Sequence, residues 1–250
     1  MLRWSGSATV FAAFCSWSAL AQTVPPSDGA WRGSLGAGLT NTTGNTDAFN
    51  AALNADAVRH TDVNKMSAQV LGLYGEREEN GATELTASLF RARARYDRDL
   101  SEITYGFLGY DLEKDKLADL KWRNSPSLGA GLHLRSAETF TFDVFAGYAY
   151  NHESLYDGTS RSFHEGLLGE ETTHKFAQET SFRQRLVVHP NLSESGEYRL
   201  VFDAGFLAPV VGRWNLTVKY SYRYQSNPPP GVEKKDTVLF TGLQYGWGPR

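Results

Sequence analysis

The sequence predicts an all-β fold, a single antiparallel transmembrane β-barrel of about twelve strands that follows an N-terminal signal peptide. Three observations support this fold class. Segments of roughly ten residues in which apolar and polar side chains alternate recur along the chain, as in strands that face lipid on one side and a lumen on the other. Aromatic residues make up 13% of the chain, and 24 residues are glycine. Beyond roughly the first two dozen residues there is no run of about 18 apolar residues, which excludes an ordinary transmembrane helix.

The strand pattern is clearest near residue 220. One set of alternate positions is apolar or aromatic throughout: Trp214, Leu216, Val218, Tyr220, Tyr222 and Tyr224. The positions between them are all polar: Asn215, Thr217, Lys219, Ser221 and Arg223. Successive side chains of a strand point to opposite faces, whereas a helix would scatter these residues around its circumference. The segment is therefore predicted to be a strand with one lipid face and one lumen face.

Other segments repeat this pattern with varying strength. In chain order, the predicted strands cover residues 31–42, 49–56, 66–76, 84–96, 102–112, 127–134, 140–150, 162–176, 181–190, 198–206, 214–224 and 236–247. Alternation is poor in 162–176 and in 181–190, so these two segments could also be merged. Bacterial single-chain barrels have an even number of strands with both ends in the periplasm, and merging would leave an odd number. We therefore keep the two segments apart.

The connections between the predicted strands sort into two kinds. The longer or turn-forming ones are 43–47, 112–122, 151–161 and 226–235, the last with three consecutive prolines, and Asn80-Gly81 is a further turn signal. The short ones are 97–101, 136–139 and 209–213. Outer-membrane barrels have long outer loops and short periplasmic turns, and with an even strand number the two kinds fall on these two sides.

The first 21 residues have the features of a signal peptide for export by the Sec pathway. Arg3 supplies the positive region, residues 8–20 the short apolar region, and Ala19-Leu20-Ala21 an A-x-A cleavage site. Phe14 stands before Cys15, where a lipoprotein anchor expects a small residue, so we do not favour an anchor. The predicted organisation is a signal peptide at 1–21, a linker at 22–30, a barrel at 31–247 and a tail at 248–250. The expected location is the outer membrane.

A soluble β-sandwich or lipocalin-like barrel is the main alternative to the transmembrane fold. Soluble β folds also alternate, but their apolar faces point inward. Tryptophan at strand ends favours the membrane, because aromatic side chains gather at the two membrane interfaces. Four tryptophans occupy predicted strand ends: Trp31, Trp122, Trp214 and Trp247.

The last strand carries a further signal. Leu243, Tyr245 and Trp247 share one face near the C-terminus, and we expect the barrel-insertion machinery to recognise them. Residues 248–250 follow, which departs from barrels that end on the aromatic residue. The other expected partners are periplasmic chaperones, outer-membrane lipid and lipopolysaccharide. A nucleic-acid partner is not expected, because the net charge of −3 gives no basic face. The oligomeric state is left open.

Several motifs taken together resemble those of a known family. They are WRGSLG at 31–36, TGNTD at 43–47, RYD at 95–97, YRYQSNPPPG at 222–231 and KDT at 235–237. The chain resembles the outer-membrane barrels named salt-induced outer-membrane protein, YdiY-like, which are classed as a domain of unknown function. The likeness runs from Trp31 to Trp247, and its most specific part is the GNTD turn combined with the triple proline. It implies the fold and the outer-membrane location and leaves the activity open.

Arginines at alternate positions of one predicted strand indicate which face meets the lumen. Arg91, Arg93 and Arg95 share a face, because residues two apart in a strand point the same way. One arginine in lipid at mid-depth costs about 2–4 kcal/mol, so all three are expected to face inward. Charged residues on the predicted lumen faces are candidate pore-lining residues: Asp56, Arg91, Arg93, Arg95, Asp143, Arg183, Arg185, Asp203, Lys219 and Arg223.

This charged lumen allows two main interpretations. Rings of arginine select anions in pores, which favours a passive channel for small solutes, anionic ones among them. Buried charges persist mainly when paired, which favours a structural or stress-response envelope barrel with a filled lumen. A lipid-modifying enzyme is a third, weaker interpretation, since it needs a nucleophile beside a base and no G-x-S-x-G motif occurs. We expect no catalytic residue, no cofactor and no metal site, because HExxH and cysteine spacings are absent.

Overall fold

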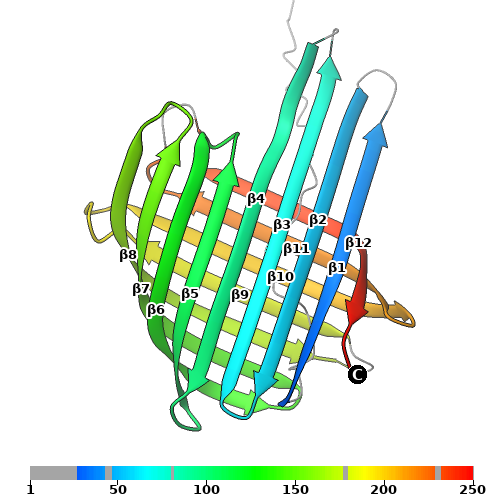
Figure 1. Cartoon of the computed structure of the whole chain (residues 1–250), viewed down its shortest axis with the longest axis vertical. Helices are drawn as coiled ribbons and strands as arrows, with labels where there is room; N and C mark the ends of the chain where they lie inside the picture. The colour runs from blue at the N-terminus through cyan, green and yellow to red at the C-terminus, as the bar shows by residue number, and fades with distance from the viewer. Residues whose placement is uncertain (1–26, 43–46, 80–81, 177–179, 229–231, 250) are drawn as a thin grey trace, which may run out of the picture.

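Twelve antiparallel strands form one closed barrel in the computed structural model, which describes residues 27–42, 47–79, 82–176, 180–228 and 232–249 (Figure 1). The strands are β1 (Asp28–Thr42), β2 (Asp47–Thr61), β3 (Asn64–Glu79), β4 (Ala82–Asp99), β5 (Thr104–Asp115), β6 (Leu120–Ala137), β7 (Phe140–Leu155), β8 (Ser160–Lys175), β9 (Ser181–Pro190), β10 (Tyr198–Val211), β11 (Trp214–Gln225) and β12 (Lys235–Trp247). Each strand pairs with its sequence neighbour, and β12 pairs with β1. No helix in the described residues is long and apolar enough to span a membrane. The predicted all-β, twelve-stranded barrel is confirmed.

The two walls of the barrel cross at a steep angle. Figure 1 shows β1 to β6 as a front wall that runs obliquely over the strands behind it, with the upper ends of β1 to β4 rising above the rest. The chain ends of the barrel, at Asp28 and Trp247, lie at the lower rim with the short turns. We call this rim the inner end, where the sequence predicts the periplasm, and the opposite rim the outer end.

Several predicted boundaries need correction. The strands are longer than their alternation indicated, so the connection expected at 112–122 is only the turn 116–119 between β5 and β6. The connection expected at 151–161 shrinks to 156–159 for the same reason. Asp28 already pairs with Thr61, so residues 28–30 of the expected linker belong to β1. The separation of β8 from β9 is confirmed.

Some of the sequence expectations lie outside the described residues. These are the signal peptide at 1–21 with the first part of the linker, residues 43–46 of the turn at 43–47, Asn80-Gly81, Pro229-Pro230-Gly231 and Arg250.

The barrel closes through a short seam between its first and last strands. β1 pairs with β12 through five residue pairs, from Gly33 with Trp247 to Ala37 with Leu243. By contrast, β1 pairs with β2 through thirteen. The expected tail is attached beside this seam, because Arg32 donates a hydrogen bond to the Pro249 carbonyl at 3.0 Å. The residues proposed as the insertion signal therefore lie at the point where the sheet closes.

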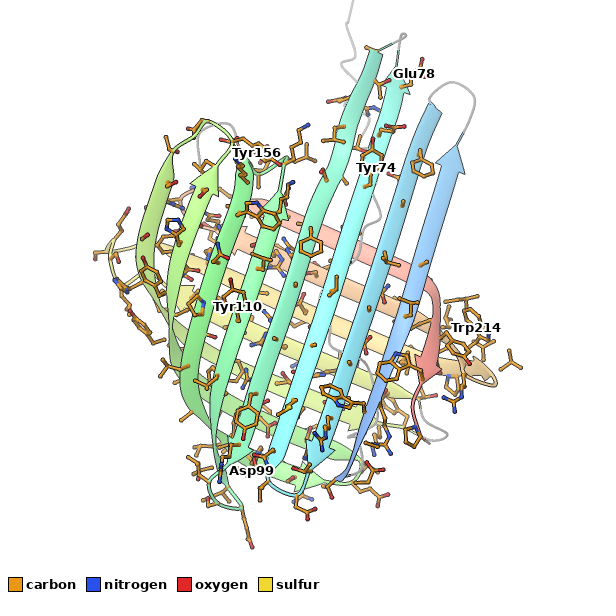
Figure 2. All side chains as sticks on the ribbon, viewed as in Figure 1. Tyr74, Glu78, Asp99, Tyr110, Tyr156 and Trp214 are labelled. Carbon is orange, nitrogen blue, oxygen red and sulfur yellow. The ribbon has the colours of Figure 1, made fainter. Side chains whose placement is uncertain are left out.

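The outer surface of the barrel is apolar. Large hydrophobic side chains are exposed on many strands, among them Leu35, Leu53, Val70, Leu108, Leu128, Leu168, Phe206, Leu216, Leu239 and Leu243. Figure 2 shows Tyr74, Tyr110 and Trp214 on the outside of the wall. Trp214 packs edge-on against Tyr245 near the inner end, with ring centroids 5.3 Å apart. Such a surface is stable in contact with hydrocarbon, whereas its exposure to water would cost free energy. The strands are therefore those of a transmembrane barrel.

The inside of the barrel carries the polar half of the alternating pattern. Fully buried side chains include Gln244, Glu153, Glu165 and Asn151. They come from β12, β7 and β8, and the outward neighbours of Gln244, Leu243 and Tyr245, are exposed and apolar or aromatic. The soluble alternative, with an apolar interior, therefore does not describe this chain.

The two faces of β11 give a first testable prediction. Val218 lies on the outer face between Leu216 and Tyr220, so Val218→Arg should place a charge in lipid. We expect the free energy of unfolding to fall by about 2–4 kcal/mol if the site is near mid-depth. Urea unfolding in lipid vesicles, followed by tryptophan fluorescence, measures it. Glu194→Arg, in the exposed β9–β10 loop, is the control and should change little. If Val218→Arg were tolerated and Arg93→Leu aggregated, the lipid and lumen faces assigned to these strands would have to be exchanged.

Candidate functional site

All the residues that the sequence proposes as pore-lining lie on the inner face of the barrel. Asp56, Arg91, Asp203 and Lys219 are buried there. A cavity at the inner end is lined by Asp56, Arg95, Asp143 and Arg183, and a narrower one above it by Arg91, Arg93 and Arg223. The guanidinium of Arg185 lies 5.2 Å from the ring centre of Phe145, itself on the inner face. Their role in conduction stays a prediction.

The three arginines of β4 each have a carboxylate partner. Arg91 pairs with Glu113 at 2.5 Å and Arg93 with Asp111 at 2.5 Å, both across to β5. Arg95 pairs with Asp97 of its own strand at 2.6 Å. The register explains the first two pairs, because Arg91 faces Glu113 and Arg93 faces Asp111 in the β4–β5 ladder. The arginine face is therefore largely neutralised along its length.

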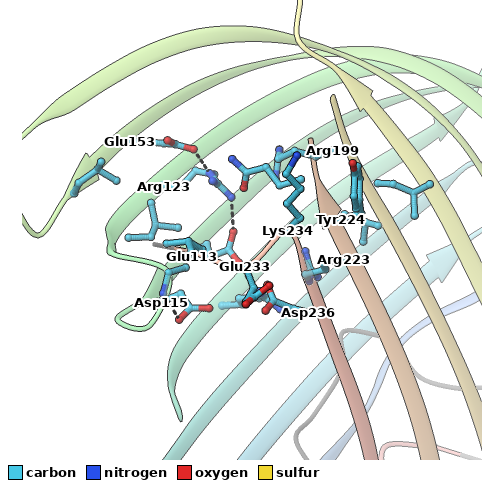
Figure 3. A pocket seen from close by; sticks show the side chains of 18 of the residues that line it. Glu113, Asp115, Arg123, Glu153, Arg199, Arg223, Tyr224, Glu233, Lys234 and Asp236 are labelled. Atoms are coloured by element: carbon cyan, nitrogen blue, oxygen red, sulfur yellow. Dashed lines mark hydrogen bonds and ion pairs between the residues drawn. The ribbon is translucent and has the colours of Figure 1, made fainter. Parts of the chain in front are cut away.

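The ion pairs continue around the wall at the outer end. Glu113 also accepts a bond from Arg123 at 2.9 Å, and Arg123 donates to Glu153 at 2.5 Å (Figure 3). Glu153 accepts a further bond from Arg161 at 2.7 Å. Glu153 is only 1% exposed, so its charge depends on the two guanidiniums that flank it. This chain of alternating charges joins five neighbouring strands, β4 to β8.

A second cluster surrounds Glu165 of β8. Arg199 of β10 donates two hydrogen bonds to its carboxylate, at 2.8 and 2.6 Å. Asn151 of β7 donates a third at 2.9 Å, and Ser125 of β6 in turn donates to Asn151 at 2.5 Å. Glu165 is 1% exposed. The cluster ties β6, β7, β8 and β10 together, and the bonds from Arg199 to Glu165 join two strands that are separated by β9.

The carboxylates of these clusters are what sequence reasoning missed. Glu113 falls within the connection that the sequence predicts at 112–122. The candidate pore-lining residues do not include Asp111, Glu153, Glu165 or Glu171. Asp111 and Glu113 lie an even number of residues after Phe107, so they share its face of the strand. This signal could have extended the alternation of β5 to them. The partners on other strands depend on register, which the alternation alone does not give.

Aromatic rings cover part of the inner wall. Tyr105, Phe107 and Phe145 are buried in a cluster on the inner face. Glycines on neighbouring strands leave room for these rings: a Cβ at Gly131 would lie 2.3 Å from Cζ of Tyr105, and one at Gly169 would lie 2.5 Å from Cζ of Phe145. The rings therefore occupy the space along the wall that these glycines leave free.

Arg95 lies over this aromatic surface. Its guanidinium is 4.1 Å from the ring centre of Phe107 and 5.2 Å from that of Phe145. A guanidinium at this distance from a ring face is attracted by the ring quadrupole. Arg95 is thereby held by Asp97 on one side and by the rings on the other, and it lines the cavity at the inner end.

The lumen is wide at the inner end and narrow above it. The inner cavity has a volume of about 410 Å³, and Lys65, Arg95, His133 and Asp143 are among its lining residues. The middle cavity, around Arg93 and Arg223, has about 60 Å³. A third cavity of about 70 Å³ lies at the outer mouth and reaches the last loop at Glu233 and Lys234 (Figure 3). The middle and outer cavities share Arg91, Glu113 and Arg223 among their lining residues, so they lie next to each other.

Family comparison decides the place of this barrel among known proteins. The family model described as protein of unknown function, DUF481, matches residues 35–247, nearly the whole barrel. The chain belongs to the DUF481 family. None of the curated proteins compared with it matches significantly.

Solved structures similar to the DUF481 barrel are distant. The translocator domain of autotransporter NalP from Neisseria meningitidis has a TM-score of 0.45 and 16% identity, over 88% of this chain and 87% of that one. The KdgM porin has a TM-score of 0.45 and 10% identity, over 86% and 98%. The Pseudomonas putida toluene transporter TodX has a TM-score of 0.32 and 10% identity, over 88% of each chain. At these scores, the function of the DUF481 barrel has to follow from its own residues.

His133 has the most organised surroundings of the inner cavity. Its Nδ1 lies 2.8 Å from Asp143 and its Nε2 lies 3.3 Å from Asp99, and the ring stacks on Tyr105 at 4.7 Å. Both ring nitrogens thus face carboxylates, and neither hydrogen bond involves a serine hydroxyl. In the described part of the chain, no group of three or more His, Cys, Asp or Glu residues could hold a metal ion. In the DUF481 lumen, His133 is thus held between two carboxylates and an aromatic ring.

The buried charge chain gives a second prediction. Glu113→Gln should leave Arg91 and Arg123 without the negative charge that they share. Because a buried polar group without its partner costs about 1–3 kcal/mol, we expect the free energy of unfolding to fall by that amount. Glu84→Gln on the same strand as Arg91 is the matched control: its ion pair with Arg77 is exposed and should contribute about 0–1 kcal/mol. Equal losses for the two variants would contradict the pairing described here.

The glycine beneath Tyr105 gives a third prediction. In Gly131→Ala the new methyl group would overlap the ring, and we expect a loss of about 1–3 kcal/mol in unfolding free energy. The same change in a Tyr105→Ala background should cost little, because the ring that blocks it is gone. Gly106→Ala is the control, since its Cβ would meet no atom closer than 3.8 Å. Urea unfolding of the four variants measures the coupling, and additive losses would count against the ring lying over Gly131.

Proposed function

We propose that this DUF481 protein is an outer-membrane channel for small solutes and that its narrow middle favours anions. The observation that carries the proposal is the composition of the middle cavity. Five arginines line it, Arg91, Arg93, Arg123, Arg199 and Arg223, against three carboxylates, Asp111, Glu113 and Glu165. A narrow polar passage with an excess of guanidinium groups attracts anions and repels cations.

Two arginines of the narrow part have donor capacity left over. The Nε of Arg223 and the Nε of Arg185 are buried and donate no hydrogen bond. Arg185 lies 3.6 Å from Glu171, beyond normal hydrogen-bonding distance. Buried donors are nearly always satisfied in proteins, by protein groups or by water. These two groups support a lumen that contains water or a passing anion.

A filled structural barrel is the second candidate. The ion pairs from Arg91 to Arg161 brace five strands, and buried aromatic rings occupy part of the lumen, which favours a stabilising role. The resemblance to the salt-induced, YdiY-like barrels adds the proposal that the protein is produced under osmotic stress. A folded barrel that carries no current would favour this second function.

Location and assembly belong to the same proposal. The apolar outer surface and the barrel closure support residence in the outer membrane after Sec export, in contact with lipid and lipopolysaccharide. Leu243, Tyr245 and Trp247 lie in the closing seam, exposed on the lipid side. We propose that the insertion machinery recognises them there, after periplasmic chaperones have delivered the chain.

Single-channel recording in a planar bilayer tests the channel. We expect discrete current steps and a reversal potential shifted toward the anion under a salt gradient. Arg223→Gln should lower the anion-to-cation permeability ratio roughly sevenfold, since a unit charge about 7 Å away in water contributes about 0.6 kcal/mol, with opposite signs for the anion and the cation. Lys121→Gln removes the same charge from the exposed end of β6 and should leave the ratio unchanged. A cation-selective current, or equal effects of both variants, would contradict anion selection.

A further inference from the structure

The lining charge of the lumen changes sign along its axis. The described residues that line the inner cavity include seven carboxylates and three basic groups. The carboxylates are Asp56, Asp62, Asp97, Asp99, Glu102, Asp143 and Glu171, and the basic residues are Lys65, Arg95 and Arg183. The middle cavity, with five arginines and three carboxylates, has the opposite excess. A net negative compartment therefore lies directly below a net positive one.

The negative excess of the inner cavity is not cancelled by its basic residues. Arg95 is already paired with Asp97, and Arg183 with Glu171. Asp62 and Glu102 lie in the β2–β3 and β4–β5 turns at the inner mouth, where they face solvent. Carboxylates at the mouth of a cavity attract cations from the solution on that side.

The two compartments meet within a short distance. Arg93 lines the middle cavity and Arg95 lines the inner one, and they are successive inward residues of β4. Two residues of a strand span about 7 Å. The Debye length at physiological ionic strength is about 8 Å, so mobile ions do not screen one compartment from the other. The lumen thus contains a sharp junction between fixed charges of opposite sign.

We propose that this junction makes the channel rectify, passing more current when the periplasmic side is positive. The proposal rests on the channel function proposed above. Anions are the main carriers in the basic middle cavity, and cations are the main carriers in the acidic inner cavity. A positive periplasmic side drives both toward the junction, where they accumulate and raise the conductance. The opposite polarity draws both away, depletes the junction and lowers the conductance.

Salt concentration separates this mechanism from a merely asymmetric shape. At 0.1 M salt the Debye length is about 10 Å, longer than the roughly 7 Å between Arg93 and Arg95 along β4, and at 1 M it is about 3 Å. Rectification by fixed charge should therefore be strong in 0.1 M KCl and nearly vanish in 1 M KCl. Rectification that persists at 1 M would be due to shape and would overturn the proposal.

The test is a current–voltage curve of single channels, with protein purified from membranes after expression of the full chain. Glu194→Cys, in the exposed outer loop between β9 and β10, allows the orientation to be assigned with a bulky thiol reagent added to one chamber. We expect current at +100 mV on the periplasmic side to exceed that at −100 mV by about twofold or more in 0.1 M KCl. A linear curve or the reverse polarity would overturn the inference while leaving the channel itself intact. Silent, folded protein would instead overturn the proposed channel function.

A matched pair of variants assigns the effect to the inner cavity. Glu102→Gln removes a charge that lines this cavity, and Glu138→Gln removes one from the β6–β7 turn at the same end, outside the lining. Neither residue is in an ion pair that braces the lumen. We expect Glu102→Gln, and more strongly Asp62→Asn combined with it, to lower the current ratio toward one. Glu138→Gln should keep the original ratio. A loss of rectification in both, or in neither, would contradict the location proposed here.

Discussion

Closure of the backbone hydrogen-bond network in lipid is the constraint on which this structure depends. A sheet in hydrocarbon has no water to satisfy its N–H and C=O groups, so its first and last strands must pair. Closure then forces alternate residues of every strand outward into lipid and the others inward. In a chain with 21% charged residues, part of that charge necessarily lies inside the barrel. The inward charges are compatible with folding because most of them meet an opposite charge there.

The sequence predicts which residues of a strand face the lumen, and it does not predict which residues of other strands they pair with. The segment from Trp214 to Tyr224 predicts both faces of β11, because apolar or aromatic residues alternate there with polar ones. The end of β5 is harder to predict from the sequence. Glu113 has a charged neighbour, so this stretch resembles a loop. Its role as the shared partner of Arg91 and Arg123 depends on two registers, β4 with β5 and β5 with β6. Hydrophobic alternation fixes which face a residue occupies and leaves its position relative to the next strand undetermined.

The aromatic lining of the lumen shows a second limit of the alternation argument. Phe145 shares its face with Thr141 and Asp143, so polarity alone makes it an exception. It fits because Gly169 on the next strand has no side chain to compete for the same space. Arg95 then lies over this ring and that of Phe107, and a basic residue in the lumen gains a contact that is not a carboxylate. The position of a charged group such as Arg95 and the space left in the lumen thus depend on the same contacts, which join residues of different strands.

The short seam between β1 and β12 has a consequence for how the barrel reaches its closed state. Its five residue pairs join positions that are farthest apart in the chain, so ordering them carries the largest loop-closure entropy of any pairing in the barrel. Local opening requires the least free energy where few hydrogen bonds are lost. The seam is therefore the pairing of the described strands that has the fewest residue pairs and the largest closure entropy. Leu243, Tyr245 and Trp247 belong to it, so local opening at the seam would expose these three residues to a partner strand.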